Sequence, residues 1–199
     1  MPTTHGVEMN AIHQPSLRVT RRAGTQRGLT LIESLMSVAV AAVVIGAVLP
    51  SFGPAVERRH LEGVAAQLAT DLLFARSLAV AQNDSVRVSF RTGSGGSCYV
   101  VHSGGAADCP CATSGPSPGT TMCSNGAMAS KTTFLAADSP VRVQANVASI
   151  LFHPALGTST PTGTVRVVAR SGKEVRQVVN IMGRVRACTP NGVAGYAAC

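Results

Sequence analysis

The uncharged and mostly apolar stretch from Ser34 to Val56 constrains the first quarter of the chain more than any other feature. The 21 residues from Leu29 to Leu49 contain one charged side chain, Glu33. As an α-helix they would be about 31 Å long at ~1.5 Å per residue, which matches the roughly 30 Å hydrocarbon core of a bilayer. An ionisable side chain at the start of such a span is costly, so Glu33 predicts a functional site with a partner group.

The residues at the start of this span, Gly28-Leu29-Thr30-Leu31-Ile32-Glu33, follow a basic segment and resemble the type IV prepilin signature. Leu29 stands where that family usually has Phe. The resemblance implies that prepilin peptidase cuts between Gly28 and Leu29 and methylates the new amino group on Leu29. It also implies that Glu33 pairs with the N-terminal amine of a neighbouring subunit during assembly. Opposite charges attract strongly in a medium of low dielectric, which agrees with that role.

Two alternatives have a similar order of basic and apolar residues. A cleaved secretory signal would need an unusually long basic region and a cut after Leu49, where Gly53-Pro54-Ala55 is a poor site. A plain N-terminal anchor is the other alternative. The start codon is also open, because Met9 could replace Met1.

Length and charge predict three segments: a leader at 1–28, a membrane-spanning helix half at 29–53 and a globular domain at 54–199. The last is long enough for a single core. A basic leader before an apolar span predicts a cytoplasmic N-terminus and an exported C-terminal part. The resemblance to prepilins implies a single-pass protein of the inner membrane with a periplasmic domain. Export permits disulfides, and all six cysteines lie beyond residue 97.

The globular domain reads as α+β, with one long helix packed on an antiparallel sheet. Pro50 to Pro54 predicts a kink or a linker after the span. Glu57 to Asn83 has helical periodicity, with Asp71 and Arg76 off the apolar stripe. In residues 103–130 the apolar side chains follow neither a helical nor a strand spacing, which predicts a long loop held by disulfides. Strands are expected at 86–91, 97–102, 141–145, 149–152, 164–169 and 175–181, the last two joined by a turn at 171–172.

The C-terminal half extends the resemblance. Its residues Phe152-His153-Pro154-Ala155-Leu156-Gly157, then Gly163, a strand at 165–168 and finally Gly183-Arg184-Val185-Arg186 resemble the GspH/FimT family of minor pilins and pseudopilins. The resemblance implies the type IV pilin fold. It implies the inner-membrane assembly platform and other major and minor pilins as partners, and a place at the pilus tip after assembly.

No constellation of residues indicates an enzyme, a metal site or a cofactor. The histidines are scattered without metal-ligand spacing. Six cysteines allow 15 pairings. Cys188 and Cys199 flank a Pro-Asn-Gly turn and could staple the tail, leaving Cys98 and Cys123 to pair with Cys109 and Cys111 in either order. A zinc site is the alternative for these thiols.

Basic residues concentrate at the C-terminal end of the sequence. From Gly163 to Cys199 the net charge is +5, equal to that of the whole chain after Gly28. Paired guanidinium groups suit phosphate oxygens. Some FimT-like relatives bind DNA through Gly-Arg-x-Arg, so the resemblance implies that Gly183, Arg184 and Arg186 bind DNA. Weaker candidates are Arg166, Arg170, Lys173 and Arg176.

The alternative for these bases is a solvated face, or ion pairs with neighbouring subunits. Aromatic residues are scarce near them, which favours backbone contacts to double-stranded DNA over stacking on single strands. The sequence as a whole therefore predicts a FimT/FimU-like minor pilin that takes part in pilus assembly and in DNA uptake during natural transformation. The alternatives are a DNA receptor merely carried by the pilus and an H-type minor pseudopilin of a type II secretion system.

Overall fold

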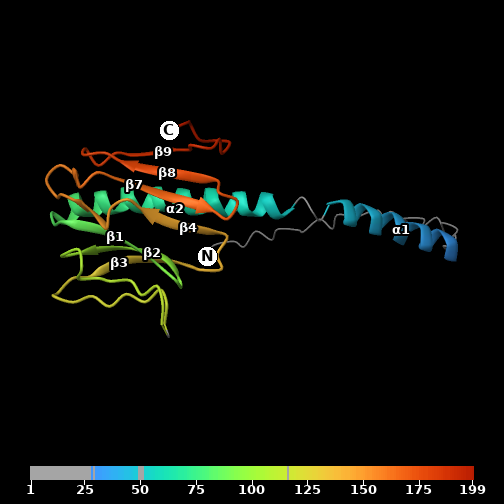
Figure 1. Cartoon of the computed structure of the whole chain (residues 1–199), viewed down its shortest axis with the longest axis horizontal. Coiled ribbons are helices and arrows are strands. Elements are labelled where there is room, and N and C mark those ends of the chain that lie inside the picture. Colours follow the sequence, from blue (N-terminus) through green and yellow to red (C-terminus); the bar gives the residue numbers. More distant parts are fainter. Residues whose placement is uncertain (1–27, 29, 49–51, 116) are drawn as a thin grey trace, which may run out of the picture. The chain divides into compact units, whose positions relative to one another are not determined.

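Two helices and nine strands follow one another along the described part of this computed structural model, which comprises residues 28, 30–48, 52–115 and 117–199 (Figure 1). The predictions for the leader, Leu29 and the Pro50-Ser51 joint lie outside it. The chain divides into two units, Met1–Ala47 and Val48–Cys199. All the buried core residues and all six cysteines lie in the second unit, so its core is complete without the first.

Helix α1 spans Leu31–Val48 and begins with a side-chain cap. The Thr30 hydroxyl accepts a hydrogen bond from the Glu33 backbone N–H at 3.3 Å. Thr30 and Glu33 thus have the Thr-x-x-Glu spacing of a capping box, in which a carboxylate also favours the positive end of the helix dipole. Ser34 and Ser37 turn their hydroxyls back to carbonyls of the preceding turn, so these polar groups are satisfied within the helix.

Helix α2 spans Phe52–Gln82 and starts five residues earlier than predicted. The kink or linker predicted at Pro50 to Pro54 lies partly outside the described residues; within them, Pro54 stands in the first turn of α2, where a proline lacks only an N–H that would have no intrahelical partner. The predicted apolar stripe faces the core, with Val64 only partly buried at its edge. Its fully buried members are Leu61, Ala65, Leu68, Leu72, Ala75 and Ala79.

One residue of α2 does not follow the prediction. Asp71, expected outside the stripe, is only 2% exposed. Its carboxylate accepts a hydrogen bond from the Tyr99 hydroxyl at 2.7 Å and pairs with the Lys131 amine at 2.6 Å. A buried carboxylate needs such partners, and they come from strands far away in the sequence. Burial and the nearby Asp71 raise the pKa of Tyr99.

The strands form two antiparallel sheets rather than the single predicted sheet, and the α+β class is confirmed. The first sheet has the order β3-β2-β1-β5-β6, with β1 at Val86–Gly93, β2 at Gly96–Ser103, β3 at Ala129–Ala136, β5 at Ser149–Phe152 and β6 at Ser159–Thr160. The second has the order β4-β7-β8-β9, with β4 at Val141–Ala145, β7 at Gly163–Ala169, β8 at Glu174–Val179 and β9 at Val185–Cys188.

Three strands, β3, β6 and β9, were not predicted. Strand β3 is rich in small and polar residues and has only one buried side chain, Leu135. Strands β6 and β9 have two and four residues, too few to establish a period. These segments are strands because each pairs with a neighbour in its sheet: β3 with β2, β6 with β5 and β9 with β8.

The core lies between the stripe of α2 and the inner faces of both sheets. The first sheet contributes Val88, Tyr99, Val101, Ile150 and Phe152, and the second contributes Val141, Val143, Val165, Val167, Val175 and Val179. Full burial of one such apolar side chain stabilises the folded state by about 1.5–3 kcal/mol relative to leaving that side chain exposed. In β2 the side chains of both faces are buried, because a second cluster of Cys98, Val100, Cys109 and Cys111 covers its other face.

Candidate nucleic-acid interface and assembly elements

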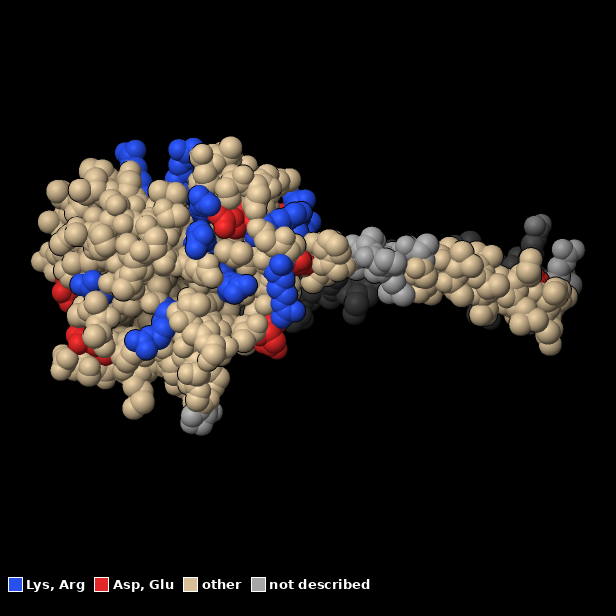
Figure 2. Space-filling view, in the orientation of Figure 1, with Lys and Arg blue, Asp and Glu red and all other residues tan. Residues whose placement is uncertain are grey.

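The outer face of the second sheet is basic because its strands alternate. Val165 and Val167 of β7 point into the core, so Arg166 between them points outward and is exposed. The pairing register places Arg166 directly opposite Arg176 of β8, and Arg186 of β9 opposite Val178. Arg142 of β4 alternates with buried valines in the same way. Figure 2 shows basic side chains spread over this side, where Figure 1 draws β4, β7 and β8 in front of α2.

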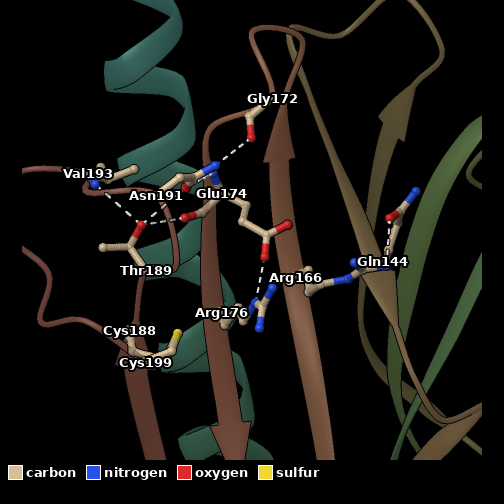
Figure 3. A network of polar contacts seen from close by, with 10 residues as sticks. All are labelled: Gln144, Arg166, Gly172, Glu174, Arg176, Cys188, Thr189, Asn191, Val193 and Cys199. Atoms are coloured by element: carbon tan, nitrogen blue, oxygen red, sulfur yellow. Dashed lines mark hydrogen bonds and ion pairs between the residues drawn. A yellow bond between two sulfur atoms is a disulfide. The ribbon is translucent and has the colours of Figure 1, made fainter.

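Two of these arginines have polar partners on the same face (Figure 3). The Arg166 guanidinium donates to the Gln144 amide oxygen at 3.2 Å. The Arg176 Nε lies 2.5 Å from a carboxylate oxygen of Glu174, which is itself buried. Glu174 is the one acid among the residues of β4, β7, β8 and β9. The face therefore keeps a strong positive excess.

The C-terminal tail buries Glu174 and fixes the edge of this face. The Thr189 hydroxyl donates to the Glu174 carbonyl at 2.9 Å, and the Asn191 side chain accepts from the Glu174 N–H and donates to the Gly172 carbonyl (Figure 3). The Cys188–Cys199 disulfide closes the tail into a loop. The tail is thus a folded cap on the β7–β8 turn.

The structure divides the predicted DNA-binding residues into two groups. Arg166, Arg176 and Arg186 share the outer sheet face, and Arg184 is exposed immediately before β9, where its backbone N–H donates to Asn180. Arg170 and Lys173 instead lie at the β7–β8 turn, where Arg170 donates to the Asp138 carbonyl. Sequence reasoning did not single out Arg142, although its Val-Arg-Val context carries the same alternating signal as Arg166.

Gly183 has a geometric role that differs from the predicted one. Its φ of 68° is in the left-handed region, and it is buried. A Cβ at this position would lie 2.1 Å from the Gly157 carbonyl oxygen and 3.0 Å from the Arg76 side chain. Arg76 in turn donates to the same carbonyl at 3.0 Å. Gly183 therefore lets the β8–β9 turn close against the loop after β5.

The cysteines form three disulfides. Cys188 bonds to Cys199, the pairing that their spacing predicts, and the open choice among the other four resolves to Cys98–Cys111 and Cys109–Cys123. The latter two brace the long loop after β2. Within it Asp108 accepts hydrogen bonds from Asn125 and from the Gly105 N–H, and both lower its pKa.

The described residues include two apolar helices. The stretch Gly53–Gln82 of α2 is long and apolar enough to cross a membrane by length and composition, but 33% of its most apolar window is buried, and the segment Leu31–Gly46 of α1 is shorter. In α2 the apolar stripe belongs to the domain core, and Asp71 is held there by Tyr99 and Lys131. Every residue from Leu31 to Gly46 is exposed, so none of the described residues of its unit covers the apolar surface of α1.

Comparison with known proteins extends these observations. The family model described as type II transport protein GspH matches residues 64–183. Among solved structures, the chain is similar to the type IV minor pilin FimU of Pseudomonas aeruginosa, at 18% identity, 69% of this chain, 97% of that chain and a TM-score of 0.47. It is also similar to EpsH, a minor pseudopilin of the type 2 secretion system of Vibrio cholerae, at 11% identity, 67% and 99% coverage and a TM-score of 0.47.

No curated protein matches the chain. The matched segment of the family model runs from the middle of α2 to the β8–β9 turn, and so takes in the core helix and most of both sheets. Since it covers more than half of the chain, the chain belongs to the GspH family of minor pilins and pseudopilins.

Proposed function

We propose that this chain is a minor pilin of a type IV pilus whose second sheet binds double-stranded DNA. The protein is held in the inner membrane by α1, with its globular unit in the periplasm, and is passed by the inner-membrane assembly platform to the pilus tip. Its role is structural and binding rather than enzymatic. The observation that carries the DNA-binding proposal is the outer face of β4, β7, β8 and β9, with four outward arginines and one buried, paired acid.

Assembly with other pilins is supported by uncharged surfaces on both helices. In α1, Glu33 is the one charged residue between Leu31 and Gly46, and all these residues are exposed. In α2, every exposed residue from Gly63 to Gln82 is uncharged, and among them Leu73, Phe74 and Val80 remain 41–50% exposed. Apolar surface of this extent is stabilised by a lipid or helical neighbour.

Membership of a pilus requires processing by prepilin peptidase at Gly28. We expect the mature chain to begin at Leu29 with a methylated amino group, which N-terminal sequencing and intact mass measure. Gly28 is exposed and precedes the Thr30 cap, so a cut there leaves the start of α1 intact. A mature terminus after Ala55 would instead indicate a secretory signal and would contradict the anchor.

Binding to the sheet face should depend on phosphates rather than on base sequence. These arginines lie on a sheet face, and no base-reading helix is evident in the described part of the chain, so we expect little sequence preference. Each neutralised phosphate contributes about −0.9 to the slope of log affinity against log salt. Two to five contacts give slopes of about −2 to −4.5.

The test is a salt titration of duplex binding by the globular unit, comparing wild type with Arg184→Gln/Arg186→Gln. We expect the slope of the double variant to fall in magnitude by about two. Arg91→Gln is the control, since it removes an exposed charge from β1 of the first sheet and should retain the wild-type slope. Equal slopes for all three proteins would assign the arginines to solvation or subunit pairing, and would leave a tip-assembly subunit without DNA binding.

The second candidate is an H-type minor pseudopilin of a type II secretion system. It is favoured by the family model, whose description names type II transport. A pseudopilin would contact exported proteins, for which a basic face offers no general advantage. Neighbouring genes for pilus assembly or for secretion discriminate the two functions.

A further inference from the structure

A second group of bases gathers where α2 begins. The Ser171 backbone N–H donates to the Glu57 carboxylate at 2.8 Å, which ties the β7–β8 turn to the first turns of α2. Arg170 and Lys173 belong to this turn, and Arg142 and Arg170 line the same cavity. With Arg58 and Arg59 of α2 they make up what we call the proximal basic cluster: Arg58, Arg59, Arg142, Arg170 and Lys173. Figure 2 shows basic side chains at this end of the globular unit.

Three acids lie near this cluster, Glu57, Glu62 and Asp138, and Asp138 contacts Arg170 through its backbone carbonyl. Glu57 is engaged by the Ser171 N–H, and Glu62 lies 2.6 Å from Arg58 and 3.6 Å from Arg59. Arg59 nevertheless has a side chain that is 86% exposed. In the described part of the chain, no carboxylate lies within ion-pair distance of Arg142, Arg170 or Lys173, and all three are exposed.

The part of the cluster that lies on α2 follows α1 closely along the chain. Helix α1 ends at Val48 and α2 begins at Phe52. Four residue steps of at most about 3.5 Å each span no more than about 14 Å. If α1 lies in the bilayer, as the proposed function has it, only three residues of chain separate the membrane-spanning helix from the first turn of α2.

We propose that the proximal basic cluster binds the anionic headgroups of phospholipids while the subunit waits in the membrane. This inference rests on the membrane anchoring of the proposed function, but not on its DNA binding. A guanidinium grips phosphate oxygens with two hydrogen bonds, and a basic side chain at an anionic surface strengthens binding by about fivefold. The contact would hold the globular unit against the bilayer, and extraction into the filament would have to break it.

The chain supplies its own probe for this contact, because Lys131 and Lys173 are its two lysines. Lys173 belongs to the cluster. Lys131 pairs with Asp71, which is 13 residues beyond Arg58 along α2, or about 20 Å at ~1.5 Å per residue. Acylation of the two amines by a membrane-impermeant reagent therefore compares a site in the cluster with a site outside it, in the same outward-facing molecules.

The experiment uses the full chain in vesicles of phosphatidylcholine, with and without phosphatidylglycerol, and peptide mass measurement of the labelled lysines. We expect phosphatidylglycerol to lower the ratio of Lys173 to Lys131 labelling by about fivefold, and high salt to restore it. Arg59→Gln/Arg170→Gln should abolish the protection of Lys173. Arg166→Gln/Arg186→Gln, which removes two charges from the sheet face, should retain it.

Three results would overturn the proposal. Equal labelling in both kinds of vesicle would show that the cluster does not contact lipid. Protection by phosphatidylglycerol that persists in Arg59→Gln/Arg170→Gln would come from lipid contacts outside the cluster. Protection of Lys173 by duplex DNA in phosphatidylcholine vesicles, but not by phosphatidylglycerol, would assign the cluster to nucleic acid. A chain that does not float with vesicles would overturn the anchoring and this inference together, whereas an unchanged salt slope in DNA binding would leave this inference standing.

Discussion

Arg166 and Arg176 lie directly opposite each other on strands β7 and β8, on the outer face of the second sheet. Like charges in directly opposed positions destabilise a sheet. Here Gln144 accepts from Arg166 and Glu174 pairs with Arg176, which offsets part of the repulsion. Keeping two cations in this position at the expense of stability is what we expect of a surface that binds an anion.

Arg166→Gln should therefore raise the free energy of unfolding by about 0.2–1 kcal/mol, while reducing the salt slope of DNA binding by about one. Arg142→Gln is the control for stability, because Arg142 is exposed on the same sheet but lies opposite Val168. It should leave the free energy of unfolding nearly unchanged. Chemical denaturation measures both variants. If Arg166→Gln instead lowered the free energy of unfolding, repulsion between Arg166 and Arg176 would not be a net cost to the fold.

Gly183→Ala tests whether this glycine serves the fold. The added Cβ would meet the Gly157 carbonyl at 2.1 Å in a backbone with a φ of 68°, so we expect a loss of about 1–3 kcal/mol. Gly192→Ala has a φ of 69° but nothing within 4 Å of its Cβ, and should lose less. Thermal unfolding of both variants gives the difference. Equal losses would mean that the contact with Gly157 adds nothing to the cost of the left-handed backbone.

His102 predicts how stability depends on pH. It is fully buried, its Nδ1 lies 2.8 Å from the Ser103 carbonyl and therefore donates, and its Nε2 accepts from Ser89 at 2.8 Å. Burial lowers the pKa of His102 below its ordinary 6.5, and the nearby Arg87 lowers it further, while the Ser103 bond and Asp108 raise it. The unfolded chain therefore takes up a proton first as the pH falls through 6.5.

Stability should consequently be fully present above pH 6.5 and decline below it, until the pH reaches the folded-state pKa. The slope for this one group is at most about 1.4 kcal/mol per pH unit. His102→Gln should be less stable at neutral pH but should have a flatter profile in this window. Denaturation curves at several pH values measure it, and parallel profiles for the two proteins would exclude His102 as the cause.

Glu33 has two candidate roles that one pair of variants separates. Glu33→Gln keeps a side chain suited to the capping box but removes the charge that would pair with a neighbour's amine. Thr30→Ala removes the hydroxyl that caps the Glu33 N–H and keeps the charge. We expect Glu33→Gln to insert into the membrane normally but to be depleted from sheared pili, and Thr30→Ala to be incorporated. The reverse result would make capping, rather than pairing between subunits, the function of Glu33.

Local pattern alone determined much of this protein. The apolar run after Glu33 gave α1, spacings of three and four along α2 gave the buried stripe, and alternation gave six of the nine strands, because these periods follow from backbone geometry within a few residues. The spacing of Cys188 and Cys199 around a turn likewise anticipated their disulfide. The Thr-x-x-Glu spacing that caps α1 is likewise a local signal in the sequence.

Tertiary structure decided what depends on partners distant in the chain. The division into two sheets, the burial of Asp71 and the three strands that were not predicted all depend on contacts between distant residues. The spacing of apolar residues along the sequence does not reveal such contacts. Charge is the clearest case: the bases after Gly163 form one group in the sequence, but β7 and β8 carry Arg166 and Arg176 onto the sheet face while their turn carries Arg170 and Lys173 to the start of α2. A base belongs to a surface through the pairing register and the direction of its side chain, and both are set only when the strands find their neighbours.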